Sequence, residues 1–256
     1  MLKAPLPWRA KLRAFRTHLL LSLVLFGAII ALTVWLWYPP PFFWIDGGMQ
    51  ITLLAAMVDI VAGPLLTFVV FRPGKPKLVM NLAVIAAVQA GALAWGVGAL
   101  YSQRPLLAAF VGHQQNGFFP VTEEQVRDGA RSLEELRALS PSHPGLVFLE
   151  LPENDAEATQ LLTSSSTSVL RQSERFRSIE GENLLRIVRA SHTPKSYEAL
   201  APEIAAAMER YVAENGGNAE QFAFVPLWGR FGYGMLALSR ADGRLVGVVA
   251  KEFRLR

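Results

Sequence analysis

The chain has 256 residues, of which 52% are hydrophobic and only 18% are charged, whereas soluble domains usually carry about 25% charged residues. Residues 1–104 contain nine Lys/Arg and two acids, and residues 105–256 contain sixteen Lys/Arg and nineteen acids. The positive charge therefore accompanies the apolar half, which excludes a basic nucleic-acid-binding domain as its source. Apolar residues throughout exclude a disordered chain, and the absence of cysteine excludes disulfides and thiolate chemistry.

Three apolar runs, 19–37, 51–71 and 78–101, predict transmembrane helices. At about 1.5 Å per residue, each run is long enough to cross a hydrocarbon core of about 30 Å. A cleaved signal peptide is the alternative for the first run. The run is longer than the usual apolar core of about 7–15 residues and ends in Trp35 and Trp37 instead of small residues, which favours a retained helix.

Basic residues at the ends of these runs predict their orientation. The N-terminal segment 1–18 and the 72–77 loop are rich in Lys and Arg, whereas the 38–50 loop contains only the acid Asp46. Basic loops stay in the cytoplasm. We therefore expect a multi-pass membrane protein with a cytoplasmic basic N-terminus, three helices within 19–101, and residues 102–256 across the membrane.

Residues 102–256 predict an α+β domain, so the fold class is a three-helix transmembrane region followed by an exported α+β domain. Alternating and apolar runs predict strands, two capping boxes predict short helices, and an Asp-Gly turn predicts a closing hairpin. The expected strands are 104–112, 117–121, 145–151, 222–228, 234–240 and 245–253, the boxes are Thr122/Gln125 and Ser132/Glu135, the turn is Asp242-Gly243, and the longer helices are 155–176, interrupted at 163–168, and one from Pro202.

No pattern in the exported half predicts catalysis. The four histidines, the Ser/Thr run at 163–168 and the glycines near the C-terminus match neither metal-ligand spacing, nor a nucleophile elbow, nor a phosphate-binding loop. We therefore expect no enzyme activity, no metal and no cofactor. The histidines, interpreted as surface or interface imidazoles, are His18, His113, His143 and His192.

Asp59 lies inside the second apolar run, where a carboxylate costs about 2.5–3.5 kcal/mol on insertion scales. In an antiparallel hairpin Gln89 of the third run lies at the same depth. Pro64 lacks an N–H, which should free the carbonyl of Ile60, and Gly63 loosens the helix beside it. Small residues repeat every fourth position in the third run and permit close helix packing.

Two interpretations of this polar pair remain open. Asp59 and Gln89 either pair only to fix the hairpin, or form a seam that receives another transmembrane helix with a polar group at the same depth. Asp46, in the sequence Ile45-Asp46-Gly47-Gly48, is either a simple Asp-Gly turn or a carboxylate at the membrane edge.

The segments YPPPFFWIDGG, VDIVAGPLLTFVVF and NLAVIAAVQAGALAWGVGALYSQRP, and more loosely VPLWGRFGYGMLALSRADGRLVGV, resemble the TfpX/TfpZ family of type IV pilin accessory proteins. The resemblance covers about residues 35 to 110 and the C-terminal end. This chain departs from the family pattern at Asn81 and at Gly112-His113-Gln114. The shared positions are Asp46, Gly47, Gly48, Asp59, Gly63, Pro64, Gln89, Tyr101, Arg104 and Pro105.

The resemblance implies a bacterial inner-membrane protein that assists its cognate major pilin and has no enzymatic activity. It also implies contact with other inner-membrane assembly components and with lipid, but not with nucleic acid. A pilin in the membrane is an apolar helix with a carboxylate near its N-terminus and, after processing, a free amine. The hypothesis places the pilin helix against Asp59, Gln89, Gly63, Pro64 and Asn81, and the pilin's exported globular head against residues 102–256. A membrane-edge set is formed by Asp46, Gly47, Gly48, Tyr101 and Arg104.

Two alternatives come from other functional classes. An intramembrane aspartyl protease would need a second embedded acid, and Asp46 lies on the far side of the membrane. A sensor would need a cytoplasmic output domain, and the cytoplasmic segments are short.

Overall fold

The architecture is taken from a computed structural model, which describes residues 8–112, 116–127, 129–164, 169–199 and 201–253. The chain divides into two compact units. The first unit comprises the residues up to Trp37 together with Met49–Tyr101, and the second comprises Tyr38–Gly48 together with Ser102–Arg256. The connection between the first two apolar helices, which the sequence grouped with the transmembrane region, is thus assigned to the same unit as the C-terminal domain.

Among the described residues, three helices are long and apolar enough to cross a membrane: Trp8–Trp37, Gly48–Val70 and Leu78–Ser102. The first helix begins well before residue 19, because the Lys, Arg, Ala and Leu residues that precede the apolar run all favour a helix. The first two helices contain π-helical segments. The first consists of α1 (Trp8–Leu32) and η1 (Thr33–Trp37). The second consists of α3 (Gly48–Ala56), η2 (Met57–Ala62) and α4 (Gly63–Val70), and the third is α5 (Leu78–Ser102).

α1 packs along α4 through a buried lysine. Lys11 is only 6% exposed, and its ammonium donates to the carbonyl of Val69 at 3.1 Å. The ammonium also lies 5.5 Å from the centre of the Phe68 ring, a cation–π distance. The rings of Trp8 and Phe15 contact the same phenylalanine. These contacts satisfy a charge that the apolar surroundings would otherwise penalise.

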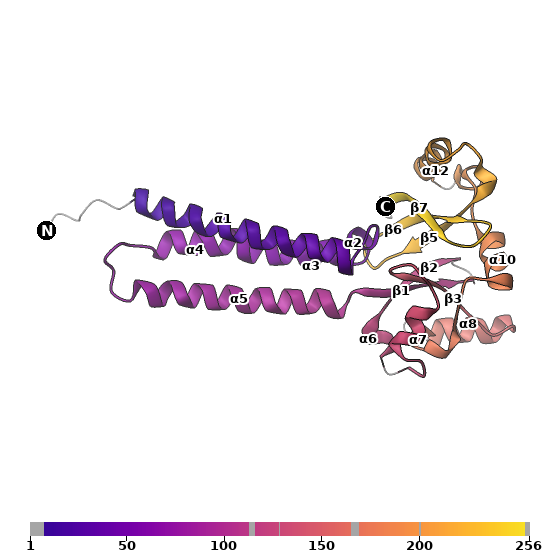
Figure 1. Cartoon of the computed structure of the whole chain (residues 1–256), viewed down its shortest axis with the longest axis horizontal. Helices are drawn as coiled ribbons and strands as arrows, with labels where there is room; N and C mark the ends of the chain where they lie inside the picture. Colours follow the sequence, from indigo (N-terminus) through magenta and orange to yellow (C-terminus); the bar gives the residue numbers. More distant parts are fainter. Residues whose placement is uncertain (1–7, 113–115, 128, 165–168, 200, 254–256) are drawn as a thin grey trace. The chain divides into compact units, whose positions relative to one another are not determined.

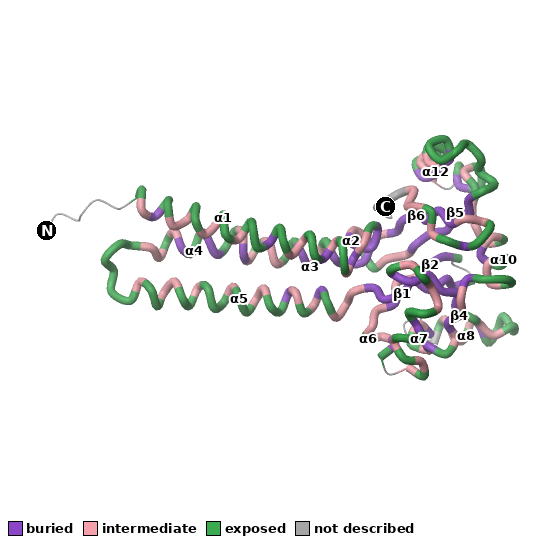
Figure 2. Tube along the Cα trace, viewed as in Figure 1, coloured by how far each residue is buried: buried purple, intermediate pink, exposed green. Residues whose placement is uncertain are grey.

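α5 runs alongside these helices (Figure 1) but packs less closely against them than α1 packs against α4, and most of its residues are exposed or half-buried (Figure 2). A Cβ added at Gly91 or Gly98 would meet nothing within 4 Å, and one at Gly96 would meet only the Cβ of Ala55, at 3.7 Å. The close packing expected from the small residues is therefore not made at Gly91 or Gly98. Small side chains remove a steric barrier, but they supply little attraction by themselves.

The second unit is built on a mixed sheet of seven strands over the described residues, in the order β4-β3-β1-β2-β5-β6-β7. β1 pairs antiparallel with β2 and parallel with β3, and β5, β6 and β7 form an antiparallel meander. Two apolar clusters lie on the two halves of the sheet. The strands are β1 (Pro105–Val111), β2 (Gly117–Thr122), β3 (Gly145–Leu149), β4 (Phe176–Arg177), β5 (Phe222–Trp228), β6 (Tyr233–Ser239) and β7 (Leu245–Phe253).

Short helices connect and cover these strands. Both predicted capping boxes are formed, at Thr122 with Gln125 and at Ser132 with Glu135. Pro202 lies in the first turn of its helix as expected. The helices are α2 (Phe42–Ile45), α6 (Glu123–Val126), α7 (Leu133–Ala138), α8 (Asp155–Ser164), α10 (Gly181–Ala190), α11 (Pro194–Tyr197) and α12 (Pro202–Glu214), with 3-10 turns η3 (Ser173–Arg175) and η4 (Ala219–Gln221).

The prediction of helix over 155–176 is confirmed for Asp155–Ser164 and wrong for its last residues, 173–176, while residues 165–168 of the Ser/Thr run lie outside the described residues. α8 ends at Ser164, and the chain from 173 forms a 3-10 turn and the edge strand β4. Phe176 is fully buried in the core, so a tertiary contact overrides the local helical composition. α10 was not predicted, although Leu184, Ile187 and Val188 keep a clear helical period that the sequence already contains.

The two halves of the sheet meet at one pair of residues, Phe118 of β2 and Leu227 of β5. Gly117 permits this approach, because a Cβ there would lie 2.5 Å from the indole nitrogen of Trp228 and 2.9 Å from the carbonyl of Pro226. Val225 and Leu227 are buried on β5 beside this junction. The junction therefore depends on a residue without a side chain.

Replacing Gly117 with valine is expected to force β2 away from β5. Overpacking of this kind costs about 1–3 kcal/mol, which lowers the unfolding temperature of a domain of this size by several degrees. Thermal unfolding of the full-length protein in detergent, followed by far-UV circular dichroism, measures the shift. An unchanged unfolding temperature would mean that the strands do not meet at this residue.

Candidate functional site

The second apolar helix changes its hydrogen-bond register at Asp59. Within η2 the N–H of Gly63 donates to the carbonyl of Val58, five residues back. In that register the donor to the carbonyl of Asp59 would be the nitrogen of Pro64, which carries no hydrogen. The carbonyl of Asp59 is therefore left without a helical donor, because a π turn spans one residue more than an α turn.

Gln89 of α5 reaches this point. Its amide nitrogen lies 3.5 Å from the carbonyl oxygen of Asp59 and 3.4 Å from the carboxylate oxygen Oδ1. A Cβ at Gly63 would overlap the amide of Gln89, so only glycine leaves room for this approach. The depth match predicted for Asp59 and Gln89 is observed, and Gly63 and Pro64 lie with them, both buried.

Asp59 is 7% exposed and lines a cavity of about 260 Å³ between α1, η2 and α5. We call this the seam cavity. Most of its remaining lining is apolar, including Phe26, Leu25 and Leu93. A wider groove of about 740 Å³ continues between α1 and α5 toward Arg9 and Arg13. The two spaces share lining residues and so extend along the same pair of helices.

His18 and Ser22 are polar residues of this site that the sequence did not identify. His18 lines both the seam cavity and the wider groove, and its Nδ1 lies 2.6 Å from the hydroxyl of Thr67 on α4. The sequence suggested only a surface or interface imidazole. Its position one residue before the first apolar run was the available signal, because an imidazole there faces either lipid or a neighbouring helix.

Two other predicted residues lie apart from the seam cavity. Asn81 is about two helical turns from Gln89 on α5, is half-buried, and lines neither the cavity nor the groove. Tyr101 stacks edge-on against Trp37, with ring centres 5.4 Å apart. The structure thus brings together four of the five predicted seam residues and leaves out Asn81.

In the second unit Asp46 is held by Arg230 of the β5–β6 turn. Its carboxylate is 2% exposed and accepts from the guanidinium Nε at 3.0 Å. Nη2 of the same guanidinium donates to the backbone carbonyl of Asp46 at 2.7 Å, and Nη1 donates to Gln103 at 2.7 Å. Asp46 is therefore more than a simple turn residue, and Arg230 and Gln103 are partners that the sequence did not reveal.

The two glycines after Asp46 permit this contact. Gly47 has a φ of +99°, which favours glycine. A Cβ at Gly48 would lie 2.8 Å from the ring of Phe43. Close by, the N–H of Phe231 donates to the carbonyl of Ile45 at 2.8 Å. Residues 38–48 are thus bound to the β5–β6 turn by backbone and side-chain hydrogen bonds together.

Tyr38 is fully buried, and its hydroxyl has no hydrogen-bond partner among the described residues. Burial raises the pKa of Tyr38 to about 12, opposed by the nearby Arg230. Arg104 pairs with Glu123 at the start of α6. The predicted departure at Gly112-His113-Gln114 lies partly outside the described residues, since 113–115 are not among them.

Replacing Gly63 with alanine is expected to displace the amide of Gln89 from Asp59, because the new methyl group occupies its place. The loss should be at most about 1 kcal/mol, the usual net value of a hydrogen bond, because the contact is long, at 3.4 Å. In a Gln89→Ala background the same change should cost almost nothing, giving a coupling of similar size. Unfolding of the four proteins in one detergent measures this, and additive losses would show that the two residues do not touch.

Burial raises the pKa of the Asp46 carboxyl, and the Arg230 guanidinium opposes that rise. Arg230→Ala should therefore destabilise the protein by about 3 kcal/mol at pH 8, because it leaves a buried carboxylate without a cation. When the folded pKa of an acid lies above its unfolded value, the free energy of unfolding falls as pH rises through the folded pKa. The loss should accordingly be smaller at pH 5 than at pH 8.

Thermal unfolding at the two pH values measures this difference. As a control, Arg230→Ala is also made in an Asp46→Asn background and compared with Asp46→Asn alone. Because an amide does not titrate, the loss of stability caused by Arg230→Ala should then be the same at both pH values. A loss that grows on acidification would contradict this account of the ion pair.

Curated relatives of this chain are proteins of Dichelobacter nodosus. It is 33% identical over 95 residues to "Fimbrial assembly protein, serogroup E1", a match of 36% of this chain and 37% of that protein. It is 32% identical over 95 residues to "Fimbrial assembly protein, serogroups C1 and C2", covering 72% of that relative. For "Fimbrial assembly protein, serogroup I" the identity is 32% over 95 residues, covering 37% of that relative.

The match thus spans little more than a third of the first and third relatives, and most of the second. No protein-family model matches the chain, and no solved structure matches it. The match to the second relative exceeds 30% identity and covers more than two thirds of that protein. The chain belongs to the family of fimbrial assembly proteins that these relatives represent.

Proposed function

We propose that this protein is an inner-membrane accessory protein of type IV pilus assembly, of the TfpX/TfpZ kind, which binds its cognate major pilin and stabilises or presents it for assembly. Two findings support the proposal. The relatives are named fimbrial assembly proteins, and the seam cavity presents polar groups inside otherwise apolar helices. The cavity is the observation that carries the proposal, because it offers buried hydrogen-bonding groups to the side chains of a guest helix.

The proposed topology follows from the basic residues. The three apolar helices cross the inner membrane, with the N-terminus and the 72–77 loop in the cytoplasm, because both are rich in Lys and Arg. Residues 102–256 are then periplasmic. The groove ending at Arg9 and Arg13 opens on the cytoplasmic side, where both arginines meet lipid headgroups.

The chemistry of the seam cavity complements both charged groups of a pilin helix. The carboxylate of Asp59 accepts hydrogen bonds, which suits an ammonium group. The amide of Gln89 and the imidazole of His18 donate hydrogen bonds, which suits a carboxylate. The contacts between Gln89 and Asp59 are long, at 3.4 and 3.5 Å, so Gln89 can turn to a guest at little cost. Each charged group of the guest would be costly in lipid alone.

We also propose that the protein acts by binding and not by catalysis. The seam cavity is lined by a single acid, Asp59, whereas an intramembrane aspartyl protease needs two. Asp46 is engaged by Arg230 in the other unit. Normal processing of prepilin in a strain that lacks this protein would support the proposal, and accumulation of unprocessed prepilin would contradict it.

The pilin-binding proposal is tested by recovery of the major pilin with the affinity-tagged, full-length protein from detergent-solubilised membranes. Asp59→Asn removes the charge and keeps the side-chain shape, and Gln89→Ala removes the amide donor. Each is expected to reduce recovery about tenfold, corresponding to about 1.4 kcal/mol. Surface piliation should fall in the same variants.

Asn81→Ala is the matched control, because Asn81 is a polar residue of α5 that does not line the cavity. It should recover as much pilin as the unmodified protein. Full recovery and full piliation in both Asp59→Asn and Gln89→Ala would show that the seam does not hold the pilin.

A further inference from the structure

A second cavity lies wholly within the C-terminal unit, where two parallel strands end. β1 and β3 are parallel neighbours. Gly112, directly after β1, and Leu151, two residues after β3, line a cavity of about 550 Å³. That volume falls in the usual range for ligand sites, about 300–1,000 Å³. In sheets with parallel strands, binding sites commonly form outside the carboxyl ends of the strands, where adjacent loops diverge.

The floor of this cavity is formed by buried, closely packed apolar side chains. Phe110 and Phe148, from adjacent strands, stack with ring centres 5.9 Å apart and planes 25° apart. Leu149 and Ala158 complete the floor, and all four residues are buried. A floor of this kind suits an aliphatic or aromatic side chain of a partner, because it removes apolar surface from water on contact.

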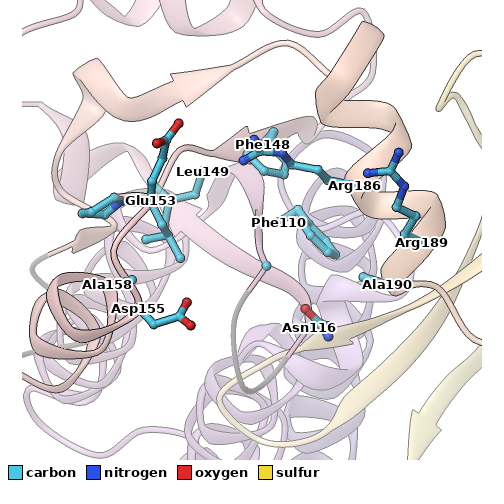
Figure 3. Close-up of a pocket in the computed structure, with 13 residues that line it drawn as sticks. Phe110, Asn116, Phe148, Leu149, Glu153, Asp155, Ala158, Arg186, Arg189 and Ala190 are labelled. Carbon is cyan, nitrogen blue, oxygen red and sulfur yellow. The ribbon is translucent and has the colours of Figure 1, made fainter.

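The rim carries opposite charges on opposite sides (Figure 3). Arg186 and Arg189, three residues apart on α10, stand on one side, and Glu153 and Asp155, between β3 and α8, stand on the other. Asn116 lies between them. All five side chains are exposed, so a bound segment can reach them.

The two sides of the rim do not neutralise each other. Both arginines contact Glu182 on their own helix, at 3.7 and 3.5 Å. Within the part of the chain that the structure describes, no ion pair joins either arginine to Glu153 or Asp155. The opposite charges face a common cavity and remain available to a partner, which is the arrangement that gives specificity and orientation to binding.

We propose that this cavity, the rim cavity, is the docking site for an exposed segment of the pilin's periplasmic head. The segment presents an apolar or aromatic side chain to the Phe110/Phe148 floor. An acidic residue on one side of it meets Arg186 and Arg189, and a basic residue on the other side meets Glu153 and Asp155. The inference rests on the proposed function and specifies which face of the exported domain contacts the pilin.

The experiment compares charge reversals in the tagged, full-length protein co-expressed with its pilin. Arg186→Glu with Arg189→Glu should lower the amount of recovered pilin about tenfold at low salt, since rim charges steer and orient a partner. The control reverses two exposed arginines outside the cavity, Arg210→Glu with Arg244→Glu, and changes the net charge equally. Control recovery should equal that of the unmodified protein.

Two further measurements keep the result interpretable. Arg186→Gln with Arg189→Gln avoids the new repulsion with Glu182 and should still reduce recovery, while unfolding temperatures verify that each variant is folded. A photoreactive residue at Asn116 should crosslink to the pilin head, as mapped by mass spectrometry. The same residue at Glu209 on α12 should not.

The outcomes separate the two proposals. If the unmodified protein recovers no pilin, both fail. If recovery depends on Asp59 and Gln89 but is unchanged in both arginine variants, or if the crosslink forms equally from Glu209, the rim-cavity inference fails and the seam proposal stands. Loss of recovery in the rim variants together with the crosslink from Asn116 supports the inference.

Discussion

A carboxylate inside an apolar helix is the constraint that organises the first unit. Asp59 cannot be left unpaired at mid-helix without a cost of a few kcal/mol. The helix responds with a π turn, and Pro64 withholds the donor that the Asp59 carbonyl would otherwise receive. The backbone carbonyl and the carboxylate of Asp59 both lie near the side-chain amide of Gln89, which occupies the space left by Gly63. One buried charge thus explains the residue types at three other positions.

The contacts within the seam are long, which is consistent with the binding role proposed for it. An N–H···O hydrogen bond in a protein is usually near 2.9 Å, whereas the Gln89 amide nitrogen lies 3.4 and 3.5 Å from the two oxygens of Asp59. The cavity beside them is bordered by His18, which adds a donor. A site that must exchange its own contacts for those of a guest benefits from weak internal contacts, because little has to be broken on binding.

The second unit distributes its charges differently. Asp46 and Arg230 form a pair with a buried carboxylate and several hydrogen bonds to one guanidinium, an arrangement that fixes a loop to the sheet. Around the rim cavity, in contrast, the two exposed arginines contact only Glu182 of their own helix, and among the described residues they form no ion pair with the acids on the opposite side. A buried ion pair fixes structure, whereas exposed charges that are not paired across a cavity can contact a partner. The two sites therefore have different roles in the same domain.

Residue patterns alone determined the three apolar helices, the closing meander, both capping boxes and the shared depth of Asp59 and Gln89. Each of these depends on local periodicity, on capping chemistry or on the fixed rise of a helix. Tertiary structure decided the rest. The contact of Gln89 with Asp59, the position of His18 beside the seam, and the pairing of Asp46 with Arg230 all join residues distant along the chain. Such contacts depend on packing in three dimensions, and no local period encodes them.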